Sequence, residues 1–108
     1  MTNLDSLMTL FQKCRPFFLA LGDPVRQEIM VILARGVQLS VKEITAQTKL
    51  SRPTISHHLR VLKDANIVVE TKVGREIFYR PQPGEYFFMV KELIDVIDEV
   101  VKQKERTR

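Results

Sequence analysis

The segment LSRPTISHHLRVLKDANI, residues 50–67, holds the side chains of this sequence that are best suited to chemistry. Two adjacent histidines and several cationic and hydroxyl residues precede its first acid, Asp64. Such side chains bind metal ions, exchange protons with a substrate or contact a phosphate backbone. The face of the secondary structure on which each side chain lies decides among these three possibilities.

Hydrophobic spacing predicts that this segment forms a helix over about residues 51–65. Ile55, Leu59 and Leu62 fall within about 40° of one another around the helix axis and form its buried stripe. His57 points outward, whereas His58 lies beside the stripe and is expected to be packed and hydrogen-bonded. Metal ligands on one helix need a spacing of three or four residues, so the adjacent histidines do not predict a shared metal site.

The outward side of the predicted helix carries hydrogen-bond donors that suit DNA. Residues near the N-terminus of a recognition helix reach base edges in the major groove. The residues predicted for this role are Arg52, Thr54, Ser56 and His57. Residues better placed for phosphate oxygens, which position a protein without reading sequence, are Lys49, Arg60 and Lys63.

Positive charge is concentrated in the middle of the chain. The net charge of the 108 residues is +4. Residues 49–80 alone give +4 (seven Lys/Arg minus three Asp/Glu), whereas residues 1–48 give +1 (five minus four) and residues 81–108 give −1 (five minus six). A localised positive patch is typical of a protein that binds a polyanion. A solvated cationic face is the alternative interpretation.

Caps and periodicity predict one mainly helical domain over residues 1–108, with a small β-hairpin. Pro16 predicts a kink or a break in the first helix. Asp23, Ser40 and Ser51 are expected to cap the next three helices, Ser40 in a capping box with Glu43. The principal expected elements are helices at about 3–20, 51–65 and 85–104 and a hairpin at about 67–80, with two more helices between the first and the 51–65 helix.

A helix-turn-helix followed by a two-stranded hairpin is a winged helix. The loop of the predicted hairpin contains Gly74, and Lys72 and Arg75 lie beside it. We expect these two cations to enter a minor groove or to touch a phosphate. A solvated turn with incidental charge is the alternative.

Composition places few other limits on function. Apolar content is 44% and charged content is 28%, as in ordinary soluble proteins. No apolar run is long enough for a membrane helix, and we expect no secretory signal. The single cysteine, Cys14, excludes an intrachain disulfide and suits a reducing cytoplasm.

Four strings together resemble the ArsR/SmtB family of winged-helix repressors: LALGDPVRQEIMVIL, LSVKEI, LSRPTISHHLRVLKDANIV and GREIFYR. The resemblance runs continuously over residues 19–80. It implies a cytoplasmic, homodimeric, prokaryotic transcription regulator that binds DNA. It also implies that the first and last helices pack together across the dimer.

The apolar pattern of the last helix is consistent with that dimer. Two adjacent stripes run along it, one of which can face its own domain and the other a partner helix. A single wide core face is the alternative. The residues expected at the dimer interface are Leu7, Phe11, Cys14, Phe87, Val90, Ile94, Ile97 and Val101.

The sequence departs from the pattern of the family's metal sensors. Ser40 and Lys42 stand where those relatives carry a Cys-Val-Cys motif, and neither side chain replaces a thiolate. The last helix has no histidine, and its acidic residues are interpreted as a solvated face. We therefore predict no thiolate or histidine metal site and no cofactor. Cys14 is either a redox sensor, with a thiol pKa lowered by Lys13 and Arg15, or a small buried hydrophobe.

These observations predict a sequence-specific DNA-binding regulator, most simply a homodimeric repressor of an inverted-repeat operator. Double-stranded DNA and a second copy of the chain are the expected partners, and the inducer is not indicated. A winged helix used only as a protein-interaction module is the alternative, which the cationic stretch from Lys49 to Lys63 disfavours. No phosphate loop, nucleophile elbow or carboxylate pair indicates an enzyme.

Overall fold

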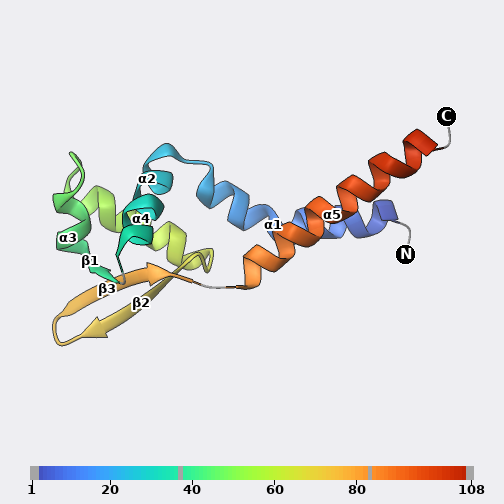
Figure 1. The fold of residues 1–108 in the computed structure, drawn as a ribbon. Coiled ribbons are helices and arrows are strands. Elements are labelled where there is room, and N and C mark those ends of the chain that lie inside the picture. Colours follow the sequence, from blue (N-terminus) through green and yellow to red (C-terminus); the bar gives the residue numbers. More distant parts are fainter. Residues whose placement is uncertain (1–2, 37, 83, 107–108) are drawn as a thin grey trace. The chain divides into compact units, whose positions relative to one another are not determined.

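Five helices and three short strands make up residues 3–36, 38–82 and 84–106, the parts of the chain that the computed structural model describes (Figure 1). The prediction of a mainly helical fold with a β-hairpin is confirmed. None of the described helices is long and apolar enough to cross a membrane. In chain order the elements are α1 (Asn3–Leu21), α2 (Pro24–Arg35), β1 (Leu39–Ser40), α3 (Val41–Ala46), α4 (Arg52–Asp64), β2 (Val68–Val73), β3 (Glu76–Pro81) and α5 (Glu85–Arg106).

The elements divide into two compact units, each with its own apolar core. One unit contains the described parts of residues 1–16 and 84–108, and the other contains those of residues 17–83. The division passes through α1, immediately after Pro16. A break at this proline was the wrong prediction, because α1 continues to Leu21. Proline removes a single backbone donor, and buried residues on both sides of it, Cys14 and Ala20, hold the helix in place.

The core of the unit formed by residues 17–83 is built around α4. The predicted stripe of Ile55, Leu59 and Leu62 has no exposed surface, which confirms it. These side chains belong to one cluster with Ile29 and Leu33 of α2, Ile44 of α3 and Tyr79 of β3. Two helices and the sheet therefore fix the rotation of α4 about its own axis.

Side-chain caps begin three of the helices as the sequence predicts. Asp23 accepts from the backbone N–H groups of Val25 and Arg26 at 2.8 and 3.1 Å. The hydrogen bond from the Arg26 N–H is the main cause of a lowered pKa at the Asp23 carboxyl, and the bond from Val25 acts in the same direction. Burial opposes this lowering but does not cancel it. Ser40 and Glu43 form the capping box of α3, and Ser51 Oγ accepts from the N–H of Thr54.

The end of α4 turns the chain sharply into the hairpin. Asn66 has a φ of 59°, its N–H donates to Lys63 O at 2.9 Å, and the N–H of Ile67 donates to Leu62 O at 2.9 Å. This pair of bonds is a Schellman motif, in which asparagine takes the left-handed position that glycine usually fills. The hairpin strands follow directly, and Gly74, with a φ of 63°, lies in their turn.

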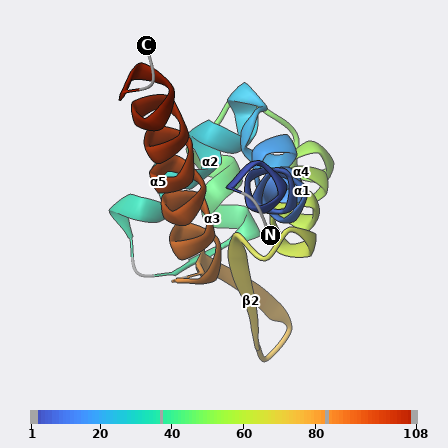
Figure 2. The ribbon, with the colours of Figure 1, turned by 90° about the vertical axis from the view of Figure 1, so that its right-hand side faces the viewer.

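The sheet has three strands in the order β1-β3-β2, all antiparallel, where the sequence predicts only two. The added strand β1 has two residues, too few to show an alternating pattern. Its second residue, Ser40, pairs with Phe78 of β3 and also caps α3. The first helix of the helix-turn-helix therefore begins at the end of β1, the edge strand that pairs with the central strand β3. Figure 2 shows the hairpin extending beyond the helices of its own unit.

In the other unit, α1 and α5 pack through Leu10, Cys14 and Leu93. Cys14 has no exposed surface, and burial, followed by the nearby charge of Glu92, raises the pKa of its thiol. The hypothesis that Lys13 and Arg15 lower that pKa was wrong. Cys14 is a buried hydrophobe in the α1–α5 core of its own chain, and its expected place at a dimer interface stays a prediction.

Truncating Leu59 tests the role of the α4 stripe in folding. Leu59→Ala is expected to lower the free energy of unfolding by about 2–5 kcal/mol, because it removes buried contacts and leaves a cavity. Val31→Ala on the exposed side of α2 is the matched control, expected to cost less than about 1 kcal/mol. Urea unfolding followed by circular dichroism measures both, and equal losses would contradict the assignment of the core.

Candidate nucleic-acid interface

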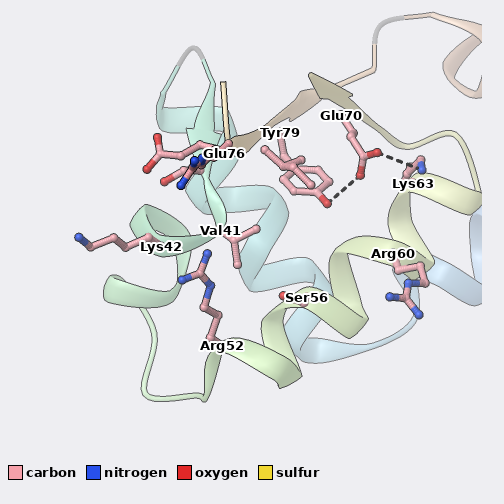
Figure 3. Close-up of a pocket in the computed structure, with 12 residues that line it drawn as sticks. Val41, Lys42, Arg52, Ser56, Arg60, Lys63, Glu70, Glu76 and Tyr79 are labelled. Carbon is pink, nitrogen blue, oxygen red and sulfur yellow. Dashed lines mark hydrogen bonds and ion pairs between the residues drawn. The ribbon is translucent and has the colours of Figure 1, made fainter. Parts of the chain in front are cut away.

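The side of α4 next to its buried stripe forms one wall of a cationic hollow. Arg52, Ser56 and Arg60 follow one another at four-residue spacing and line this hollow together with Lys63. The other walls come from the start of α3 and from the hairpin. In Figure 3, Ser56 lies between Arg52 on one side and Arg60 on the other. The buried stripe and the hollow-facing stripe are thus two sides of one amphipathic helix.

Five cations and two acids surround the hollow. Two cations come from outside α4: Lys42 at the start of α3 and Arg75 at the hairpin turn. The sequence predicts Arg75 as a wing residue, and the structure places it in the lining of the hollow, to which α4 also contributes. Lys42 is not among the predicted contact residues, because its six-residue helix shows no polar face by periodicity. The acids are Glu70 of β2 and Glu76 of β3.

Two of the four predicted base-contact residues do not line the hollow. The Thr54 hydroxyl lies 2.9 Å from Ser51 Oγ, and the residue is half-buried at the N-terminus of α4. His57 is exposed, and its ring centroid lies 5.5 Å from that of His58. Of the remaining predicted contacts, Lys49 and Lys72 are exposed outside the hollow.

Lys63 is joined to the hairpin by a polar network that sequence analysis did not find. Its Nζ lies 3.2 Å from Glu70 Oε1, and the Tyr79 hydroxyl donates to Glu70 Oε2 at 2.9 Å (Figure 3). Glu70 and Tyr79 face each other across β2 and β3. The cross-strand register is the signal that relates these two residues, but the sequence alone does not fix it.

The network shifts the pKa values of its members in opposite directions. Hydrogen bonds from Tyr79 and then from Lys63 lower the pKa of Glu70. Burial, followed by the hydrogen bond to Glu70, raises the pKa of Tyr79 to about 12. Glu70 is therefore an anion and Tyr79 a neutral donor throughout the physiological pH range.

A second polar cluster holds α4 against α2 and the end of α1. The guanidinium of Arg26 donates to the carbonyl oxygens of Ala20 and Leu19 at 2.6 and 3.3 Å. Its Nη1 also lies 3.2 Å from Nδ1 of His58. Because arginine has no acceptor, His58 accepts at Nδ1 and carries its proton on Nε2 in this arrangement. The expectation of a packed, hydrogen-bonded His58 is confirmed.

The part of the chain that the structure describes contains no group of three or more His, Cys, Asp or Glu side chains that could hold a metal ion. A helix-turn-helix, an exposed cationic second helix and an adjoining β-hairpin instead define a winged-helix, DNA-binding transcription regulator.

Comparison with known proteins identifies the family. Residues 23–69 match the bacterial regulatory proteins of the arsR family. Over 93 residues the chain is 39% identical to a helix-turn-helix-type transcriptional regulator of Methanocaldococcus jannaschii. This match covers 86% of this chain and 100% of the relative. It is 36% identical over 62 residues to the transcriptional repressor SdpR of Bacillus subtilis, covering 57% of this chain and 68% of that protein.

The fold agrees with these sequence matches. A solved ArsR-like transcriptional regulator from Rhodococcus has a TM-score of 0.67 and 27% identity, over 90% of this chain and 87% of that structure. The protein belongs to the ArsR family of bacterial regulatory proteins. The family is one of transcriptional regulators rather than of enzymes.

The raised pKa of Tyr79 makes a prediction about stability at high pH. Because its pKa in the folded protein, about 12, exceeds the ordinary value of 10.0, its contribution is intact below pH 10.0 and is lost as the pH rises toward 12. Tyr79→Phe lacks the hydroxyl and should be less stable than wild type below that window. Urea unfolding measured from pH 10.0 to about 12 should show the difference in free energy of unfolding between the two proteins shrinking as the pH rises. A difference that stays constant would refute the stabilising hydrogen bond between Tyr79 and Glu70.

Proposed function

We propose that this protein is a homodimeric repressor that inserts α4 into the major groove of an inverted-repeat operator. The observation that carries the proposal is the stripe in the cationic hollow formed by the exposed Arg52 and Arg60 and the half-buried Ser56 between them. A guanidinium and a hydroxyl near the N-terminus of a recognition helix match the hydrogen-bonding edges of bases. The name of the relative SdpR, a transcriptional repressor, supports repression as the outcome.

In this proposal the contact residues have separate roles. Arg52 and Ser56 read base edges, with Thr54 and His57 flanking them at the first turns of α4. Arg60 and Lys49 contact phosphates, and the hairpin adds Arg75 and Lys72 at a neighbouring groove or phosphate. The protein would act in the cytoplasm, where its operator lies.

The proposed dimer is supported by an apolar stripe that the chain leaves exposed. Phe87, Ile94 and Val101 recur every seven residues on α5 and are 68%, 58% and 50% exposed. On α1, Phe11 is 42% exposed. The other predicted interface residues, Leu7, Val90 and Ile97, are half-buried against the chain's own α1–α5 core. A two-fold dimer would place two copies of α4 about one DNA turn apart.

Substitutions in α4 should separate base reading from phosphate contact. Arg52→Ala is expected to weaken binding to a duplex selected from a random library by roughly 1–3 kcal/mol, with a smaller loss on a scrambled duplex. Arg60→Ala should weaken both duplexes alike and reduce the salt dependence. Lys91→Ala, an exposed cation on α5, is the control, expected to change neither. Mobility shifts over a salt series measure all three.

Equal losses on both duplexes for Arg52→Ala would refute its role in base reading. If wild type bound neither duplex, the alternative of a protein-interaction module would replace the proposal.

Placing a charge in the exposed α5 stripe should disrupt the dimer. Ile94→Glu is expected to convert a dimer into monomers, because the carboxylate would be buried against an apolar partner surface. Glu99→Gln is the control, since this exposed residue lies about 140° around the helix from Ile94. Analytical ultracentrifugation reports the masses, and a wild-type monomer or a dimeric Ile94→Glu variant would contradict the proposed interface.

A further inference from the structure

One carboxylate in the cationic hollow opposes the charge that DNA binding requires. Glu70 is held there by Lys63, 3.2 Å from its Oε1, and by the Tyr79 hydroxyl, 2.9 Å from its Oε2. Tyr79 is only 7% exposed and is paired with Glu70 across the hairpin, so the position of the carboxylate is well defined. A fixed negative charge beside phosphates weakens binding to every sequence.

The ion pair of this carboxylate with Lys63 adds little to fold stability, and base reading does not account for the carboxylate either. The Lys63 and Glu70 side chains are 47% and 30% exposed, and ion pairs so exposed to solvent contribute little to stability. A glutamate can accept from the amino group of cytosine. Both oxygens of Glu70 already have partners within the chain, however.

We propose that Glu70 is a specificity-determining residue, which withholds the Lys63 ammonium from phosphates and holds the hairpin at a fixed angle to α4. Binding then depends more on Arg52 and Ser56, whose contacts with base edges form only on a matching sequence. The inference rests on the proposed insertion of α4 into DNA. It gives Lys63 a different role from the phosphate contact that the sequence predicts.

Glu70→Gln is the decisive variant, because it keeps the size of the side chain and an oxygen that accepts from Tyr79 while it removes the charge. Freed Lys63 should gain a phosphate contact, so affinity for a scrambled duplex should rise roughly threefold to tenfold. The slope of log affinity against log salt should steepen by about 0.9 for each bound subunit. Affinity for the selected duplex should rise less, because the hairpin angle is less firmly held, so the specificity ratio falls.

Asp98→Asn is the matched control for net charge. It also removes one negative charge from an ion pair with a lysine, Lys102, 2.8 Å away on α5. Asp98 does not line the hollow. Its substitution should leave the salt slope and the specificity ratio near the wild-type values.

Lys63→Met keeps the test decisive even if Glu70→Gln does not fold. In the wild-type background this change should cost less than about twofold on the scrambled duplex, because Lys63 contributes no phosphate contact there. Combined with Glu70→Gln it should abolish the gain in affinity. Fluorescence anisotropy over a salt series measures every variant on both duplexes.

Two results would overturn the inference. One is a Glu70→Gln protein whose salt slope, and whose ratio of affinities for the selected and scrambled duplexes, match those of Asp98→Asn. The other is a Lys63→Met protein that loses a full phosphate contact on the scrambled duplex. If wild type itself did not distinguish the duplexes, the proposed function would fail, and this inference with it.

Discussion

The burial of three side chains on one side of α4 is the constraint on which the rest of the structure depends. Ile55, Leu59 and Leu62 are all fully buried, in contact with the side chains of two other helices and the sheet. The helix cannot rotate without exposing them, at a cost of a few kcal/mol for each side chain. Core packing therefore also fixes which residues face outward, and Arg52 and Arg60 occupy that outer side.

Besides core packing, two polar attachments hold the hairpin to the helix-turn-helix, one through β3 and the other through Glu70 of β2. At one, Leu39 and Ser40 pair with Tyr79 and Phe78, so that α3 begins on the sheet. At the other, Glu70 links Tyr79 to the end of α4. The first attachment is made of backbone pairing and the second of charged, partly exposed side chains. The second is therefore the one that solvent, salt and nearby phosphates can alter.

Local signals predicted much of this architecture, and long-range pairing explains what they missed. The caps at Asp23, Ser40 and Ser51 and the α4 stripe depend on residues within one or two helical turns, so spacing alone reveals them. Strand β1 and the Glu70–Tyr79 contact depend on strand register, which a single sequence does not fix. The burial of Cys14 depends on packing between α1 and α5, and its flanking cations gave the opposite direction for its pKa.

Methylation protection on a selected duplex tests most directly whether the outer side of α4 enters the major groove. Dimethyl sulfate attacks guanine N7 in that groove and adenine N3 in the minor groove. The account predicts protected guanine N7 atoms in two half-sites about 10 base pairs apart, with exposure restored in an Arg52→Ala complex. Protection confined to adenine N3, or guanine protection that Arg52→Ala leaves unchanged, would contradict it.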